Sequence, residues 1–310
     1  MTLAYALTSV LLCQVTGIGN MNILVTGSNG QLGRELRRVA QSSEDKYIFT
    51  DVSEGEDTLY LDITDEAAVS ELCAARKVDV IVNCAAYTDV DAAETDAIAA
   101  DKLNHLAPST LAKIAARSSA VLIHISTDYV FDGKANTPYS ESSATSPTSV
   151  YGTTKLDGEQ AIQDSGCKYI IIRTAWLYSA HGRNFVKTIG NLCMEKPSLK
   201  VVVDQVGSPT YAGDLALAIM HIIDTRSLDK CGLYHFSNEG AISWYDLAKT
   251  VAESRGSDCL IEPCMSSEYP SRVARPHYSV LDKTLFKQTF AYSIPYWRDS
   301  LSKCIAELWK

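Results

Sequence analysis

Short apolar runs alternate with amphipathic segments through the first half of the chain. The runs are rich in Ile and Val and too short for helices, which is typical of strands. They occupy residues 23–25, 46–51, 80–86 and 120–126. The segments between them predict helices over residues 34–40, 65–76 and 108–117. Thr64 or Asp65 is a suitable N-cap for the second helix. Because no two strands are joined by a tight turn, the pattern predicts an α/β fold with a doubly wound parallel (Rossmann) sheet.

Beyond Trp176 the strict alternation loosens. Helical patterns cover residues 185–193, 212–223, 244–254 and 297–308. Short strand patterns cover residues 201–203, 233–236 and 259–261. We therefore expect a dinucleotide-binding domain over residues 21–176 and a smaller α/β domain, mainly for substrate, over residues 177–310.

Three glycines at steps of three follow the first apolar run. Gly27 permits a sharp turn, Gly30 lets backbone amides approach a pyrophosphate, and Gly33 lets the next helix pack close to the strand. The N-terminus of that helix offers N–H groups to an anion. A strand, a glycine turn and a helix in this order predict a dinucleotide site, although an ordinary tight turn would have the same local appearance.

The choice of coenzyme stays open at this point. Asp51 ends the second predicted strand, where a carboxylate grips the adenosine ribose and favours NAD over NADP. Asp51 could equally be a turn residue. Arg34 and Arg37 are close enough in sequence to favour the extra phosphate of NADP.

Composition excludes several classes of function. The net charge of −9 and the lack of a basic tract argue against a nucleic-acid partner. Nine cysteines without C-x-x-C pairs indicate a reducing, cytoplasmic setting, and no metal-ligand spacing occurs. The stretch from Leu3 to Val15 is mostly apolar but too short to span a membrane. No Lys or Arg precedes Arg34, unlike in a signal peptide, so we regard residues 1–20 as an upstream extension or the result of a start site placed too early, with the fold beginning at Met21.

Tyr151 and Lys155 lie four residues apart on a predicted helix and therefore share one face. An ammonium beside a phenol lowers the pKa of the phenol, towards the range useful for proton transfer. Thr127, at the end of a predicted strand, could bond both the phenol and a substrate carbonyl. Together these groups suit hydride transfer from a nicotinamide to a ketone. The same spacing recurs at Tyr245 and Lys249, but that copy follows no Ser/Thr-tipped strand, and we interpret it as an ordinary amphipathic helix.

Several longer segments carry a family resemblance. They are residues 82–91 (VNCAAYTDVD), 126–133 (STDYVFDG) and 149–156 (SVYGTTKL), with further agreement at residues 173–178, 204–210 and 275–277. In these segments the chain resembles the extended short-chain dehydrogenase/reductases, and within them the dTDP-4-dehydrorhamnose reductases. The resemblance runs from residue 21 to the end, and it implies that segments of the two domains interleave.

The resemblance implies reduction of dTDP-4-dehydro-6-deoxy-L-mannose to dTDP-L-rhamnose by NADH or NADPH. Tyr151 would be the proton donor, Lys155 its electrostatic partner and Thr127 the hydroxyl that tunes it. The cofactor would be lined by Gly30, Gln31, Leu32, Asp51, Asp62, Ile63, Ala86, Tyr87 and Thr88, together with the glycine turn, Tyr151 and Lys155. The sugar would meet Thr127, Asp128 and Trp176, with Val90 at the pocket edge. The resemblance also admits a homodimer.

Alternatives remain for the function and for single residues. The chain could be an epimerase or reductase of another nucleotide sugar. It could also be a non-catalytic, dinucleotide-binding subunit like the methionine adenosyltransferase beta subunit. Arg275 could bind the substrate diphosphate or anchor the C-terminal segment. His124, on a buried strand, is interpreted as packing.

Overall fold

The computed structural model describes residues 19–269 and 273–310. The expectation for residues 1–18 therefore lies outside the described part of the chain. Seven strands form one sheet in which every pairing is parallel. In spatial order they are β11 (Gly232–His235), β6 (Lys168–Thr174), β5 (Val121–Thr127), β4 (Val80–Asn83), β1 (Asn22–Thr26), β2 (Lys46–Asp51) and β3 (Leu59–Tyr60). The predicted doubly wound sheet is confirmed.

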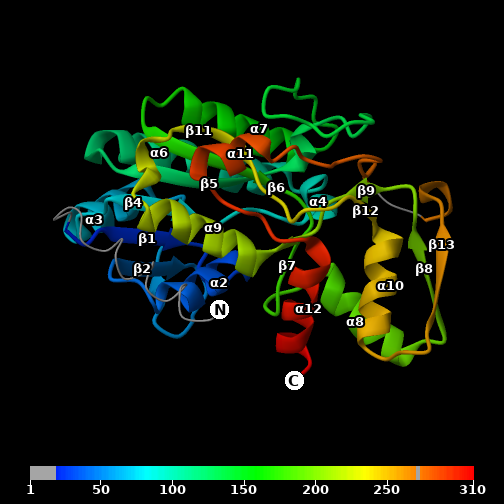
Figure 1. The fold of residues 1–310 in the computed structure, drawn as a ribbon. Helices are drawn as coiled ribbons and strands as arrows, with labels where there is room; N and C mark the ends of the chain where they lie inside the picture. The colour runs from blue at the N-terminus through cyan, green and yellow to red at the C-terminus, as the bar shows by residue number, and fades with distance from the viewer. Residues whose placement is uncertain (1–18, 270–272) are drawn as a thin grey trace.

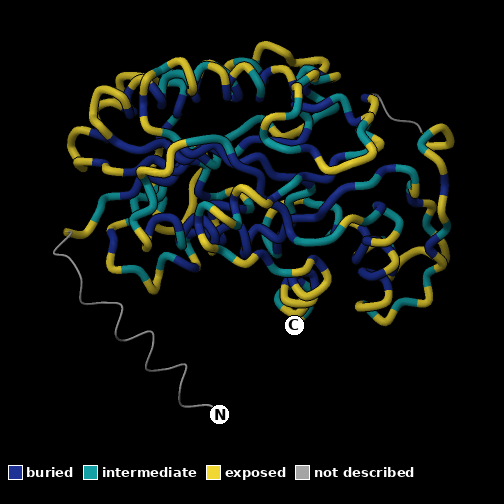
Figure 2. The backbone as a smooth tube through the Cα atoms, turned by 45° about the horizontal axis from the view of Figure 1, so that its top comes forward, coloured by how far each residue is buried: buried dark blue, intermediate teal, exposed yellow. Residues whose placement is uncertain are grey.

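Helices cover both faces of this sheet (Figure 1). On one face lie α2 (Gln31–Ala40), α9 (Ala212–Asp224) and α11 (Thr284–Phe290). On the other lie α3 (Glu66–Arg76), α6 (Ala107–Ser118) and α7 (Val150–Gln163). The side chain of Asp65 caps α3 by accepting the Ala68 N–H at 3.1 Å, as one of the two predicted caps. Figure 2 shows the central strands buried between these helices.

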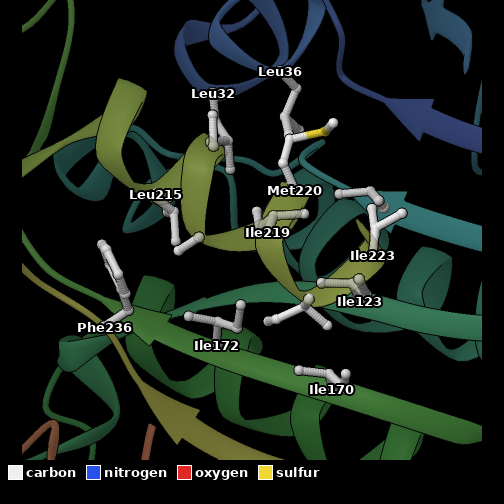
Figure 3. Packing of buried hydrophobic residues seen from close by; sticks show 14 of the residues in the cluster. Leu32, Leu36, Ile123, Ile170, Ile172, Leu215, Ile219, Met220, Ile223 and Phe236 are labelled. Carbon is white, nitrogen blue, oxygen red and sulfur yellow. The ribbon is translucent and has the colours of Figure 1, made fainter. Parts of the chain in front are cut away.

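The core below α2 and α9 is built from aliphatic side chains of helices and strands. In Figure 3, side chains of α2 and α9 meet those of β5 and β6. The members labelled there include Leu36, Ile219, Ile123 and Ile172, each with 0% of its surface exposed. Strands buried on both faces need apolar residues at successive positions, which explains the unbroken apolar runs in the sequence.

A second set of elements packs beside the carboxyl edge of the large sheet. It contains α8 (Phe185–Glu195), α10 (Trp244–Ser254), α12 (Trp297–Leu308) and the parallel pair β8 (Ser198–Val202) and β13 (Leu260–Cys264). Two-stranded pairs join β7 (Leu177–Tyr178) to β10 (Thr210–Tyr211) and β9 (Val206–Gly207) to β12 (Ile242–Ser243). The second half of the chain thus contributes to both parts, because α9 and β11 belong to the layers of the large sheet.

One predicted strand is shorter in the structure. The apolar run 80–86 forms a strand only to Asn83. The backbone then leaves the sheet, since the Ala85 N–H bonds the Asn83 side chain at 3.2 Å and the Tyr87 N–H bonds the Asn104 side chain at 2.9 Å. These side-chain partners replace the sheet hydrogen bonds and carry the loop along the carboxyl edge.

Candidate active site

The glycine turn lies directly after β1 and leads into α2. Gly27 has a φ of 63°, and a Cβ there would lie 2.6 Å from the Ala85 nitrogen. A Cβ at Gly33 would meet the backbone of Ser28. Gly30 precedes α2 without a side-chain cap, and its own N–H bonds the Gly27 carbonyl at 3.1 Å. The turn therefore brings backbone groups and a helix N-terminus together with little side-chain bulk.

This turn borders a cavity of about 800 Å³ at the carboxyl edge of the large sheet. Fifteen of the predicted site residues line it: Gly27, Gly30, Gln31, Leu32, Asp51, Asp62, Ile63, Ala86, Thr88, Val90, Thr127, Asp128, Tyr151, Lys155 and Trp176. The structure therefore brings the two ends of the predicted site together from segments that are far apart in the sequence.

Two predicted cofactor residues do not line this cavity. Gly33 faces the turn, where it permits close packing. Tyr87 is held through its backbone, because the buried Asn104 side chain accepts its N–H at 2.9 Å and donates to its carbonyl at 3.0 Å. The same amide donates to the Thr154 hydroxyl on α7 at 3.3 Å. Asn104 thus joins the loop after β4 to the helix that carries Tyr151.

Sequence reasoning missed Asn104, and its setting explains why. It lies in η1 (Lys102–Leu106), a π-helical segment between α5 (Ala97–Asp101) and α6. A π segment widens a helix locally and occurs frequently at functional sites. A buried Asn inside a helical pattern was the available signal, but its partners come from residues 17 and 50 positions away.

Asp51 is engaged by the loop that follows it. Its carboxylate accepts the Ser53 N–H at 2.9 Å, the Ser53 hydroxyl at 2.8 Å and the Asn29 N–H at 3.0 Å. Nearby, the Arg37 guanidinium lies 4.2 Å above the Phe49 ring and donates to the Thr58 hydroxyl at 2.9 Å. The carboxylate thus organises the rim of the cavity, and both coenzyme alternatives remain compatible with this rim.

Tyr151, Lys155 and Thr127 line the same cavity. The helix α7 begins after Ser149, whose hydroxyl accepts the Gly152 N–H at 3.1 Å. The Thr127 side chain is hydrogen-bonded to the Tyr151 phenol, and its own hydroxyl donates to the Asp128 carboxylate at 3.0 Å. The Lys155 Nζ donates to the Ile125 carbonyl at 2.7 Å and lies 3.3 Å from His124 Nε2.

Burial governs the protonation of these groups. It raises the pKa of Tyr151 above its ordinary value, and the Thr127 hydrogen bond offsets only part of this effect. It lowers the pKa of Lys155 to about 8, with Glu159 acting in the opposite direction. It raises the pKa of Asp128 to about 6. The predicted lowering of the phenol's pKa is therefore wrong for this structure, because burial and the neighbouring Asp128 and Tyr129 all raise the pKa of Tyr151.

His124 is more than a packing residue. Its ring is fully buried on β5, and both of its nitrogens have polar partners, Asn83 Nδ2 at 3.0 Å and Lys155 Nζ at 3.3 Å. Its full burial agrees with the sequence interpretation as packing, to which the structure adds the two polar partners. Its position three residues before the end of β5 gave no indication of the contact with α7.

A second hollow of about 1,490 Å³ adjoins the first and shares Val90, Asp128 and Trp176 with it. The Trp176 ring stacks on that of Trp244, with centroids 3.6 Å apart. Trp176 has a φ of 49°, and a Cβ at Gly207 would lie 2.6 Å from its ring. The indole is therefore held between the two parts of the molecule, as expected for a residue at a cleft rather than inside one core.

Arg275 lines this second hollow, where it has protein partners. Its guanidinium donates to the Asp91 carboxylate at 2.5 Å and to the Tyr129 hydroxyl at 3.1 Å. It thus ties the C-terminal segment to α4 (Val90–Ala93) and η2 (Asp128–Val130). This is the anchoring alternative of the two that the sequence left open, and a phosphate would have to share the guanidinium with Asp91.

A match to a family model shows which family the chain belongs to. The model of the RmlD substrate binding domain matches residues 21–309. The chain belongs to this family. Its members include relatives that this chain matches over nearly their whole length. The dTDP-4-dehydrorhamnose reductase of Escherichia coli (strain K12) is 38% identical over 297 residues, covering 93% of this chain and 98% of the relative.

A second relative is named for a different sugar. A probable dTDP-4,6-dihydroxy-2-methyloxan-3-one 4-ketoreductase of Streptomyces antibioticus is 40% identical over 291 residues, covering 93% of this chain and 96% of that protein. Both relatives are named for the reduction of a dTDP-linked sugar.

Solved structures of the family have the same fold. A dTDP-4-dehydrorhamnose reductase from Clostridium acetobutylicum superposes with a TM-score of 0.88 at 41% identity, covering 94% of this chain and all (100%) of that one. The Bacillus anthracis enzyme, solved in complex with NADP, has a TM-score of 0.86 at 33% identity and covers 93% of this chain and 100% of its own. The described helices include none that is long and apolar enough to cross a membrane.

Proposed function

We propose that this protein reduces dTDP-4-dehydro-6-deoxy-L-mannose to dTDP-L-rhamnose with hydride from NADPH or NADH. The observation that carries the proposal is that Tyr151, Thr127 and Lys155 line the same cavity as the glycine turn, next to Asp128 and Trp176, which border both this cavity and the second hollow. The choice of sugar is supported by membership of the RmlD substrate binding domain family and by the names of the relatives.

The first cavity fits a dinucleotide. Gly27 and Gly33 leave no room for a Cβ, so the turn keeps its backbone close to the cavity wall. Gly30 has only the Gly27 carbonyl near a virtual Cβ, at 3.2 Å, and it opens α2 without a side-chain cap. The first amides of α2 would hold the pyrophosphate, and Asp51 and Asp62 lie where the adenosine end would rest. When bound, the reduced nicotinamide supplies the hydride.

The chain itself would handle the proton. The ketone carbon takes up the hydride, the C=O π pair moves to the oxygen, and that oxygen takes the proton from the Tyr151 hydroxyl. Burial keeps this phenol protonated at neutral pH, which suits a donor in the direction of reduction. The Thr127 hydroxyl orients the phenol, and the Lys155 ammonium stabilises the phenolate that remains.

The second hollow would take the sugar nucleotide. The Trp176 ring is stacked on Trp244 and lies close to Gly207. Asp128 and Val90 line both hollows. We assign residues 21–176 mainly to the coenzyme and residues 177–310 mainly to the substrate. A homodimer and a cytoplasmic location belong to this proposal as well.

A second candidate is reduction of a different dTDP-linked 4-keto sugar. It is favoured by the Streptomyces antibioticus relative, whose 40% identity exceeds the 38% of the Escherichia coli reductase. The coenzyme half and the proton donor would be the same, and only the contacts in the second hollow would differ.

Anaerobic mixing with reduced coenzyme and each sugar tests the proposal. The loss of nicotinamide absorbance is followed with dTDP-4-dehydro-6-deoxy-L-mannose and with a second dTDP-4-keto sugar. A higher kcat/KM for the first supports the proposal, and a higher value for the second supports the other candidate. Coenzyme binding without turnover of any 4-keto sugar would contradict both, and would indicate a non-catalytic dinucleotide-binding subunit.

A further inference from the structure

A buried chain of hydrogen bonds runs below the cavity, across three neighbouring strands and into α7. The Thr26 hydroxyl of β1 donates to Asn83 Oδ1 of β4 at 2.6 Å. Asn83 Nδ2 lies 3.0 Å from His124 Nδ1 of β5, and His124 Nε2 lies 3.3 Å from Lys155 Nζ. None of the four side chains has more than 2% of its surface exposed. Polar groups so deeply buried must satisfy one another.

The Asn83 amide has only one orientation that fits its surroundings. Its Oδ1 accepts the Ala85 N–H at 3.2 Å as well as the Thr26 hydroxyl. A backbone N–H can only donate, so the oxygen must face Ala85 and the NH₂ group must face His124. The amide then donates to His124 Nδ1, which is the acceptor in this pair.

The orientation of Asn83 fixes the tautomer of His124. Burial, and then the charge of Lys155, lower the pKa of His124 well below its ordinary value, so the ring is neutral. A neutral imidazole carries one N–H, and because Nδ1 accepts, the proton lies on Nε2. This N–H points at Lys155 Nζ. An amine can accept it, whereas an ammonium has only donors and would face donor against donor.

We propose that His124 is a positioning residue that donates its Nε2 proton towards Lys155 and disfavours the ammonium form, so that Lys155 exchanges its proton near neutral pH. The inference rests on the proposed function for the reaction in which Lys155 takes part. The tautomer of His124 and its contact with Lys155 rest on the hydrogen-bond chain alone. Burial already lowers the pKa of Lys155 to about 8, so a further contact that disfavours the ammonium acts in the same direction. A residue poised in this range can both stabilise a phenolate and return a proton to it.

Other charged groups around Lys155 have partners of their own. Glu159, one turn further along α7, raises the pKa of Lys155, but its carboxylate is held by Arg173 of β6 at 2.9 and 2.6 Å. Asp128 of η2 accepts from Thr127. On the segments packed against α7 from outside, His105 pairs with Asp101 at 2.9 Å. Among these groups, only His124 is within hydrogen-bond distance of the Lys155 nitrogen.

The tautomer can be read directly in the unmodified protein. Long-range proton–nitrogen NMR correlation on ¹⁵N-histidine-labelled protein shows which ring nitrogen carries hydrogen, and His124→Gln assigns the signal among the six histidines. The expected result is a proton on Nε2 and no titration across the neutral range. A proton on Nδ1, or a ring that is charged at neutral pH, overturns the proposal. This measurement needs no sugar, and the tautomer is read in the native chain.

The pH dependence of coenzyme binding tests the effect on Lys155. NADPH affinity is followed by tryptophan fluorescence in the native chain, His124→Gln and His124→Leu. The control is His235→Gln, which removes a second fully buried histidine that bonds the Tyr139 carbonyl instead. We expect a native midpoint at about pH 8. Both His124 variants should lower the acid constant by about threefold or more, which moves the midpoint to higher pH, and the control should not.

The outcomes separate this inference from the proposed function. Midpoints that move in the His124 variants support the inference even if no 4-keto sugar is turned over, in which case only the proposed function falls. Midpoints that coincide in all four proteins overturn the inference even if the native chain is an active reductase. A loss of folding or of affinity without a shift in midpoint indicates a purely structural role and overturns it as well.

Discussion

The chain carries the same tyrosine–lysine spacing on two helices, and the two copies have different surroundings. On α7, Tyr151 and Lys155 line the cavity, and the Lys155 side chain is only 2% exposed. On α10, Tyr245 packs at the edge of the smaller core and Lys249 is exposed to solvent. The difference arises from what packs against each helix. The strand β5 offers Lys155 a carbonyl and a histidine, whereas Lys249 has no such polar partner within the described residues.

Close backbone approach also distinguishes the two helices. On α7, Gly152 and Gly158 lie so near the carbonyls of Tyr129 and Asn104 that a Cβ would collide with them. On α10, the position seven residues after the tyrosine is Ala252, a buried part of an ordinary apolar core. A motif on a helix therefore acquires its chemistry from the neighbouring strand and from how near that helix can come to it.

The largest effect should come from removing the phenol hydroxyl on α7. We expect Tyr151→Phe to lower kcat by about 10²- to 10⁴-fold, because the proton donor is lost, while coenzyme affinity is retained. Tyr245→Phe should leave kcat unchanged. Steady-state kinetics with the keto sugar compare the two. Equal losses in both variants would mean that the α7 copy has no special role.

Next in size should be the loss of the amine. Lys155→Met removes the charge that stabilises the phenolate, and we expect kcat/KM to fall by about 10- to 1,000-fold. Lys249→Met should have no effect on kcat/KM. In the native protein, activity that depends on the ammonium should decline as the pH rises through about 8, the pKa of Lys155. A pH profile that is flat through this range would argue against that dependence.

Gly158 on α7 and Ala252 on α10 occupy matching positions, and we expect the first to require glycine and the second to require alanine. Gly158→Ala should destabilise the protein by about 1–3 kcal/mol, since the new methyl group meets the Asn104 carbonyl. Ala252→Gly should also destabilise it, by about 1 kcal/mol or more, through lower helix propensity and the loss of a buried methyl group. Urea unfolding measures both. The comparison fails if Gly158→Ala is neutral or stabilising.

The smallest effect should come from a buried carboxylate. Burial raises the pKa of Asp128 from 3.8 to about 6, so the folded protein favours its neutral form. The unfolding free energy should therefore fall as the pH rises from 3.8 to about 6. Asp128→Asn should remove this decline and stabilise the protein at neutral pH by about 1–2 kcal/mol.

A carboxylate at the start of α10 provides the control for this change. Asp246 is exposed and forms a capping box with Ser243, accepting its N–H at 2.8 Å. Asp246→Asn should lower stability slightly, which is the opposite sign. Thermal unfolding at neutral and at acidic pH measures both variants. An Asp128→Asn protein that is less stable at neutral pH would contradict the argument from burial.

Local patterns predicted what depends on neighbours in sequence. The apolar runs and the glycine turn predicted the large sheet and the start of α2, because burial on both faces and a tight βα connection leave clear traces in a chain. The pairing of Tyr151 with Lys155 on one helix face followed from helix geometry in the same way. The roles of the site residues stay predictions until variants are measured.

Long-range contacts and burial could not be predicted in this way. The strand β11 lies beside β6, although more than fifty residues separate them in the chain, so the pattern alone assigned it to the smaller part. The direction of the pKa shift of Tyr151 depends on how much solvent the finished fold removes. The contact of His124 with Lys155 depends on the register of β5 against α7.

The π segment Lys102–Leu106 sets a constraint on the length of the chain itself. A π turn accommodates one more residue than an α turn, and each residue of an α-helix advances the chain by about 100° around its axis. Deleting a single residue upstream within this helix would restore regular winding and rotate Asn104 away from the Tyr87 backbone, without altering any group at the reacting centre. Homologous chains that keep this contact must therefore keep the number of residues between Tyr87 and Asn104, whatever their side chains. A deletion in this segment should be tolerated less well than a substitution.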